Sequence, residues 1–122
     1  MTLPTEITLH QKSRVLEIAF DDGNRYTLPF EFLRVHSPSA EVRGHGPGQE
    51  VLQVGKQDVI LTEVTPVGSY ALKLTFDDGH DSGLYTWDYL HELGKNQEAK
   101  WEKYLRQMAE AGESRMTDAN LE

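Results

Sequence analysis

Hydrophobic and polar residues alternate along two stretches of the chain, and the two stretches also resemble each other in sequence. Residues 13–23 align without gaps on residues 69–79, and both end in Asp-Asp-Gly. Their alternating apolar residues are Leu16, Ile18 and Phe20 in the first stretch and Leu72, Leu74 and Phe76 in the second. This is the period of a strand with one buried face, and Asp-Gly tolerates the positive φ angles of tight turns. Each stretch is therefore predicted to form a strand that ends in a hairpin turn.

Each predicted hairpin has a further strand ahead of it. Residues 6–10 and 58–65 read as strands that lead into the two stretches, and residues 24–28 and 82–85 read as the return strands after the turns. Each half of the chain is thus predicted to contribute three antiparallel strands.

After each return strand the period changes, and a short helix is predicted. Pro29 suits the start of a helix over residues 29–34, because its missing N–H would have no partner there. In the second half, Thr86 is placed to cap a helix over residues 87–93, and Gly94 suits the position just past its end. The predicted fold is α+β, a two-layer sandwich built from a duplicated β-β-β-α unit with antiparallel hairpins.

A stripe of apolar side chains marks one more helix, over residues 95–112. Its members recur at i, i+3, i+4 and i+7 and are Trp101, Tyr104, Leu105 and Met108. We expect this stripe to pack on the domain formed by residues 1–94, with docking on a partner as the alternative. The polar tail, residues 113–122, is expected to be frayed.

Between the two halves, residues 36–48 have no usable periodicity and are rich in glycine, proline and serine. Loops longer than about 12 residues in small domains tend to be functional or disordered. This segment is therefore either a binding surface or a mobile linker between the halves.

Composition narrows the classes of function. The chain has 122 residues, 12 basic and 20 acidic side chains, a formal charge of -8 and no cysteine. The negative charge argues against nucleic acid and anionic membranes as partners, and any metal would need histidine and carboxylate ligands. The sequence has no apolar run of membrane-spanning length, about 18 residues, and no secretory signal pattern. We expect a soluble cytoplasmic protein.

The candidate chemistry centres on histidine. None of the five histidines has the spacing of a metal or catalytic motif, and Ser37 and Ser39 have only the neighbouring His36 as an evident base. The turn over residues 77–81 places His80 among three aspartates. These four side chains either serve only the geometry of the turn or hold a divalent ion. No enzyme is expected, although an unrecognised hydrolase or isomerase stays open because acid–base sites need not follow linear motifs.

Several of these segments resemble one known family. The two Phe-Asp-Asp-Gly turns, residues 28–34 and the loop over residues 37–48 are similar to the gamma-butyrobetaine hydroxylase-like N-terminal domain family, across residues 5–94. The resemblance implies a small α+β domain. Bacterial members are largely free-standing small proteins of unknown function. Related modules precede the oxygenase domain of carnitine-synthesis hydroxylases or are attached to iron–sulfur carrier ATPases, which implies an accessory or docking role.

The resemblance also implies where a metal would lie in the hydroxylases. Their module has a structural zinc held by three cysteines after a Leu-Arg pair and by a histidine in the second turn. Leu33 and Arg34 match the pair, and His80 matches the histidine. The cysteine positions are occupied here by Ser37, Ser39 and Val42. Three of the four ligands are missing, and no oxygenase domain is expected in the remaining chain, so neither that zinc site nor hydroxylation is predicted.

Together these patterns predict a noncatalytic accessory or binding module that contacts a protein partner through residues 36–48. The alternative is a protein that binds iron or zinc through His80, with Asp77, Asp78 or Asp81 and with His36 or His45 as further ligands. The residues expected to be exposed and to take part in recognition are Arg34, His36, Arg43, His45, His80 and Asp81.

Overall fold

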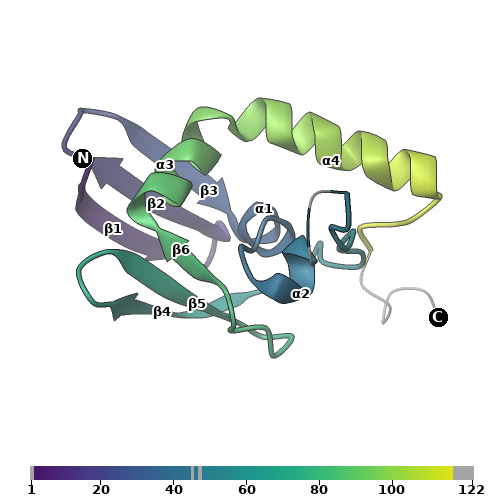
Figure 1. Cartoon of the computed structure of the whole chain (residues 1–122). Coiled ribbons are helices and arrows are strands. Elements are labelled where there is room, and N and C mark those ends of the chain that lie inside the picture. Colours follow the sequence, from purple (N-terminus) through teal and green to yellow (C-terminus); the bar gives the residue numbers. More distant parts are fainter. Residues whose placement is uncertain (1, 45, 47, 117–122) are drawn as a thin grey trace.

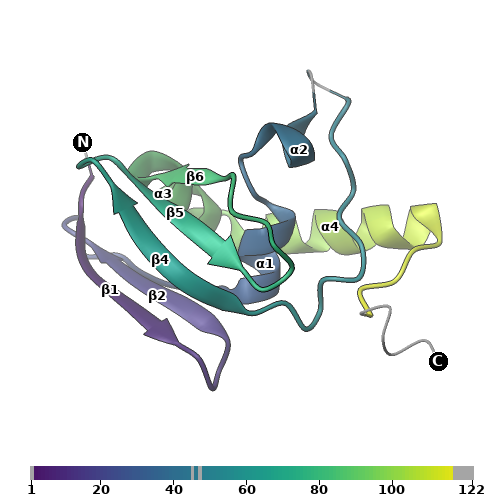
Figure 2. The same ribbon diagram turned by 90° about the horizontal axis from the view of Figure 1, so that it is seen from below.

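The structure is a computed structural model and describes residues 2–44, 46 and 48–116. Within this part of the chain, two antiparallel sheets of three strands each have the orders β1-β2-β3 and β4-β5-β6. Each sheet leads into a helix, and a C-terminal helix follows (Figures 1 and 2), so the predicted α+β fold is confirmed. The elements are β1 (Pro4–His10), β2 (Val15–Phe20), β3 (Arg25–Pro29), α1 (Phe30–Val35), α2 (Ala40–Arg43), β4 (Leu61–Val67), β5 (Ala71–Phe76), β6 (Leu84–Thr86), α3 (Trp87–Lys95) and α4 (Gln97–Ala111).

The two alternating stretches form the central strands, β2 and β5. Leu16 of β2 is opposite Leu28 of β3, and Leu72 of β5 is opposite Tyr85 of β6, so the alternation places these side chains on the buried faces. Both sheets also have a register irregularity at the start of their first strand. The two halves therefore share strand order, direction and the position of this irregularity.

Several predicted boundaries differ from the observed ones, and two of these differences have a steric reason. β4 begins at Leu61 and continues through Pro66, which is tolerated because β4 is an edge strand. α3 continues through Gly94 instead of ending before it. A Cβ atom on Gly94 would lie 2.2 Å from Cγ of Tyr26, so this glycine lets α3 approach β3 closely and does not terminate the helix. The predicted cap is confirmed, because Thr86 accepts a hydrogen bond from the Tyr89 N–H at 3.2 Å.

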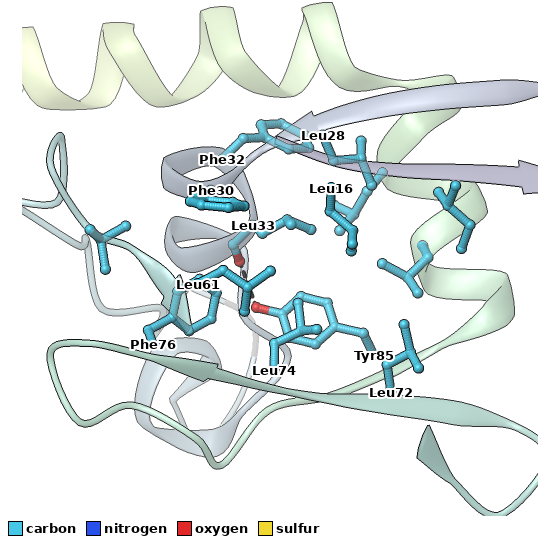
Figure 3. Close-up of a cluster of buried hydrophobic side chains, with 14 of the residues drawn as sticks. Leu16, Leu28, Phe30, Phe32, Leu33, Leu61, Leu72, Leu74, Phe76 and Tyr85 are labelled. Carbon is cyan, nitrogen blue, oxygen red and sulfur yellow. Dashed lines mark hydrogen bonds between the residues drawn. The ribbon is translucent and has the colours of Figure 1, made fainter. Parts of the chain in front are cut away.

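The main hydrophobic core lies between the two sheets, with α1 at one end (Figure 3). Leu16 and Leu28 of the first sheet face Leu74 and Tyr85 of the second. Every residue of α1 is buried. The Tyr85 hydroxyl donates a hydrogen bond of 2.6 Å to the Leu33 carbonyl, which satisfies the polar end of a fully buried ring.

The C-terminal helix α4 extends from α3 past α1 (Figure 1) and packs on the domain through most of its apolar stripe. Tyr104 and Met108 form a second apolar cluster with Val35, and Trp101 contacts both clusters. Leu105, the fourth member of the stripe, is exposed. Among the described helices, none is both long and apolar enough to cross a membrane.

The segment between the halves and the tail after α4 are more ordered than the sequence pattern indicated. Residues 40–43, expected to be loop, form the short helix α2, which buries Val42. The described part of the tail contacts the domain, because the Gly55 and Gln57 N–H groups donate to the carbonyls of Ser114 and Arg115 at 2.9 and 2.8 Å. Both segments are ordered by contacts with residues elsewhere in the chain, which a local sequence pattern does not reveal. Residues 117–122 lie outside the described residues.

Candidate functional site

The turn after β5 fixes the position of the groups around it. Asp77 accepts a hydrogen bond of 3.0 Å from the Ile60 N–H, and Asp78 accepts one of 3.1 Å from the His80 N–H. Gly79 has a φ of +89°, a value that residues other than glycine rarely adopt. The Asp-Asp-Gly sequence thus orients the second oxygen of Asp78 and the ring of His80 toward the rest of the molecule.

Asp78 is paired with two cations from distant segments. Its Oδ2 lies 2.9 Å from Nε of Arg34 and 2.6 Å from Nζ of Lys56. Arg34 also donates to the side-chain oxygen of Gln53 at 2.9 Å. Burial by itself raises the pKa of Asp78, but the hydrogen bonds from Lys56 and the His80 N–H and the charge of Arg34 lower it to about 2. The carboxylate is therefore ionised and joins α1 to the second turn.

His80 is buried, with 6% of its surface exposed, and contacts the base of the central loop. Its Nε2 lies 2.8 Å from Oγ of Ser37 and 3.4 Å from Oγ of Ser39, and its Nδ1 lies 3.3 Å from Glu41. Burial and then the charge of Arg34 lower the pKa of His80, and this outweighs the opposing effect of Glu41. The ring is neutral at pH 7 and hydrogen-bonds the serines.

This order of serine, histidine and glutamate resembles a hydrolytic triad, but its burial argues against nucleophilic catalysis. Only 1% of Ser37 is exposed, and a Cβ atom on Gly83 would lie 2.5 Å from its Oγ, so the hydroxyl is covered closely by the chain. A nucleophile must reach a substrate atom at near-contact distance. The contacts therefore hold the loop against the second turn, and we assign them no reaction.

The same cluster tests the fit of a zinc ion of the hydroxylase kind. Three of the four implied ligand positions lie together, because Ser37 and Ser39 both contact His80. The fourth position, Val42, is buried in α2. Their chemistry does not fit zinc, because hydroxyls are poor ligands and valine is none. Within the described residues, no group of three or more histidine and acidic side chains is arranged to hold a metal.

Iron or zinc binding by another ligand set stays a prediction. It is tested by following amide NMR shifts of the untagged protein during additions of zinc and, without oxygen, ferrous iron. Saturable shifts that converge on His80 and disappear in His80→Ala would support it, and equal shifts in parent and variant would contradict it.

The other predicted recognition residues are divided between buried and exposed positions. Arg34 and His80 were expected to be exposed and are buried, because each is used by the internal contacts described above. His36 is half-buried, with Nδ1 2.9 Å from the Phe32 carbonyl, and burial lowers its pKa. Arg43 and Asp81 are exposed. His45 lies outside the described residues.

Arg43 is held by an aromatic neighbour although it faces solvent. Its guanidinium lies 5.0 Å from the ring centre of Tyr89, and the Tyr89 hydroxyl donates to the His36 carbonyl at 2.5 Å. Glu41, which also belongs to α2, accepts a hydrogen bond of 3.2 Å from Ser82. We name the exposed groups of Glu41, Arg43 and Asp81 the loop platform.

Several residues of this site could not be found from spacing in the sequence. Lys56 and Gln53 come from a stretch with no motif, and Ser37 and His80 are separated by 43 positions. The one signal was the resemblance to the hydroxylase module, which had associated positions 37, 39 and 80. The resemblance located the cluster, but the residues at these positions make hydrogen bonds here and are not metal ligands of the hydroxylase kind.

Comparison with known proteins gives a consistent result. The family model described as "Gamma-butyrobetaine hydroxylase-like, N-terminal" matches residues 7–91. Two proteins solved by NMR are 55% and 50% identical to the chain, with TM-scores of 0.84 and 0.82. The matches cover 97% and 96% of this chain and 93% and 87% of those chains.

A crystal structure from Acidithiobacillus ferrooxidans also matches. It is described as a protein of unknown function in the DUF971 family, is 42% identical, and has a TM-score of 0.63. The match covers 75% of this chain and 91% of that one. Among curated proteins, none matches the chain.

Proposed function

The chain belongs to the gamma-butyrobetaine hydroxylase-like N-terminal family, and on that premise we propose that it is a noncatalytic binding module whose loop, residues 36–48, contacts a protein partner. The solved relative from Acidithiobacillus ferrooxidans is itself a protein of unknown function. The proposal therefore depends on the site of this chain and is not taken from a relative.

One observation carries the proposal: the contact of His80 with Ser37 and Ser39 holds the base of the loop against the second turn. A loop that is ordered before binding loses less conformational entropy on binding. The anchored segment leaves Arg43 and Asp81 in solvent, together with Glu41, whose side chain is 70% exposed. These groups form a charged surface on a fixed support.

The chemistry of the loop platform favours a protein surface. Glu41 and Arg43 both belong to α2, and Asp81 precedes Ser82, which donates to Glu41. The whole chain carries a formal charge of -8, so a polyanion such as nucleic acid would be repelled. A protein surface with complementary charges can pair with both signs at once.

The proposal is tested by affinity purification under native conditions with two variants of equal net charge. Arg43→Glu with Asp81→Lys inverts two charges of the loop platform, and Arg106→Glu with Glu110→Lys inverts two exposed charges on α4. We expect a partner to be recovered with the parent chain and the α4 variant and lost with the loop variant. Binding of the purified partner, measured by calorimetry, should weaken at least about tenfold. A partner that binds all three proteins equally would contradict the role of the loop.

A further inference from the structure

A cavity that none of the loop-platform residues lines contains a buried carboxylate. It has a volume of about 660 Å³ and lies where α1 meets the junction of α3 and α4, with Phe32, Gly94 and Trp101 among its lining residues. Glu31 of α1 also lines it and is only 8% exposed. Because an ionised carboxylate at such a position is costly without a partner, the cavity needs a cation.

Arg115 provides that cation from the tail after α4. Its Nε and Nη2 donate to the two oxygens of Glu31 at 2.8 and 2.7 Å, a pair of parallel bonds that suits the planar guanidinium. The guanidinium also lies 5.2 Å from the ring centre of Trp101. A carboxylate fork beside an aromatic face distinguishes arginine from lysine, whose ammonium cannot make both bonds in this geometry.

The segment that carries Arg115 contacts the domain through its main chain as well as its side chain. We call residues 113–116 the C-terminal strap; it is visible after α4 in Figure 1. Two hydrogen bonds join its main chain to the segment between the halves, from the Gly55 N–H to the Ser114 carbonyl and from the Gln57 N–H to the Arg115 carbonyl. The other strap side chains, those of Glu113, Ser114 and Met116, are exposed. A segment with so few buried apolar contacts opens at low free-energy cost.

We propose that this cavity is an arginine-recognition site, and that Arg115 occupies it until an extended, arginine-bearing segment of a partner protein takes its place. Such a segment would pair its guanidinium with Glu31, cover Trp101, and offer its carbonyls to the N–H groups of Gly55 and Gln57. The formal charge of -8 also attracts a basic partner. This inference does not depend on the loop platform, which uses other residues.

The chain's own strap sets how tightly a partner must bind. A tethered group acts at an effective concentration in the millimolar range, so Arg115 competes with any incoming arginine. Removing Arg115 should therefore increase the measured affinity of the site for an added arginine peptide, and changing Glu31 should abolish that affinity.

The test uses full-length Arg115→Ala and a peptide that copies residues 112–116, together with the same peptide carrying citrulline in place of arginine. Binding is followed by the NMR shift of the Trp101 indole N–H. We expect the arginine peptide to bind Arg115→Ala saturably and to bind the parent at least about tenfold more weakly. The citrulline peptide should bind Arg115→Ala at least about tenfold more weakly than the arginine peptide does. The matched control, Glu31→Gln with Arg115→Ala, should also lose binding at least tenfold.

Two further measurements keep the proposal falsifiable. If Arg115→Ala unfolds, Arg115→Lys retains a cation beside Glu31, and it should bind the peptide more tightly than the parent does. Equal binding to the control variant, or equal binding of the citrulline peptide, would overturn the site. Light scattering could also show that the parent is a dimer and Arg115→Ala a monomer. The arginine in the cavity would then come from a second copy of this chain, and the proposal of a different partner protein would be wrong.

Discussion

The two Asp-Asp-Gly turns of the molecule can be compared bond by bond. In each, the first aspartate accepts a hydrogen bond from the N–H just ahead of the sheet's first strand, and the second aspartate accepts one from two residues on. These distances are 3.2 and 2.9 Å in the turn after β2, and 3.0 and 3.1 Å in the turn after β5. Gly23 and Gly79 share a φ of +89°. The same local sequence has produced the same main-chain turn twice.

The second aspartate of each turn then pairs with the helix of the opposite half. Asp22 lies 2.7 Å from Nε2 of His91 in α3, and Asp78 lies 2.9 Å from Nε of Arg34 in α1. Lys56 joins Asp78 only, because the segment between the halves reaches the second turn. This added segment makes the second turn the more enclosed of the two.

The repeated halves share a common framework, and the segment between them makes the two turns different. The position after the turn glycine is Asn24 in the first half, where it is exposed, and His80 in the second, where Ser37 and Ser39 cover it. The candidate site is therefore the place where the two halves differ. Four predictions test this contrast.

The largest difference is expected between Arg34→Ala and His91→Ala. Removing Arg34 breaks its buried contacts with Asp78 and Gln53, although Lys56 still pairs with Asp78, and should lower the free energy of unfolding by about 3 kcal/mol. Removing His91 should have a smaller effect, because its pair is more exposed. The side chains of His91 and Asp22 are 20% and 33% exposed, against 8% and 22% for the Arg34–Asp78 pair. Urea unfolding followed by circular dichroism at pH 7 measures both. In an Asp78→Asn background, Arg34→Ala should cost less, and equal losses in both turns would contradict the contrast.

An exchange of the residues after the turn glycines should show the next largest difference. His80→Asn keeps a residue that suits the turn but loses the contact with Ser37, and we expect a loss of about 2 kcal/mol. Asn24→His places a histidine at an exposed position and should change stability by at most about 0.5 kcal/mol. Amide NMR spectra should show shifts in the loop for His80→Asn only. Loop shifts of similar size in both variants would argue against the anchoring role of His80.

The turn glycines themselves should respond alike. Gly23→Ala and Gly79→Ala each force a side chain into a positive φ, and a Cβ atom at either position would meet no neighbour within 4 Å. We expect each to lower the free energy of unfolding by about 1 kcal/mol through backbone strain alone. Urea midpoints at a fixed protein concentration compare them. A markedly larger loss at Gly79 would show that the turns differ in main-chain geometry as well as in surroundings.

The smallest effect concerns pH. Burial lowers the pKa of His80 below 6.5, so the folded chain binds fewer protons there than the unfolded chain. Stability from this group is present above pH 6.5 and falls as the pH drops below it, with a slope of at most about 1.4 kcal/mol per pH unit. His36 contributes in the same direction, so the test is the difference between parent and His80→Asn from pH 7 to pH 5. Parallel profiles for the two proteins would contradict the assignment to His80.

Local rules predicted much of the fold because they act over a few residues. The alternation in β2 and β5, the hairpin glycines and the Thr86 cap could all be recognised within short windows, and the structure contains each of them. Gly94 was misread as a helix end because its role depends on Tyr26, which lies in the other half of the chain.

The candidate site was predictable only in outline. His80 could be selected from its turn, and Arg34 from its position after Leu33, but both were expected to be exposed. Their burial follows from contacts with Asp78 and Ser37 across 44 and 43 positions, and no local pattern encodes such distances. The C-terminal strap was missed for the same reason, since Arg115 meets Glu31 across 84 positions.

By itself, the sequence determined the strands, the turns, the order of the elements apart from α2, and the resemblance to a family, because alternation, glycine placement and capping are properties of neighbouring residues. Only the tertiary structure decided that His80 contacts the loop serines and that Arg115 pairs with Glu31 beside a cavity. Burial and ion pairing depend on which distant segments meet, and that is settled when the two sheets close over a shared core.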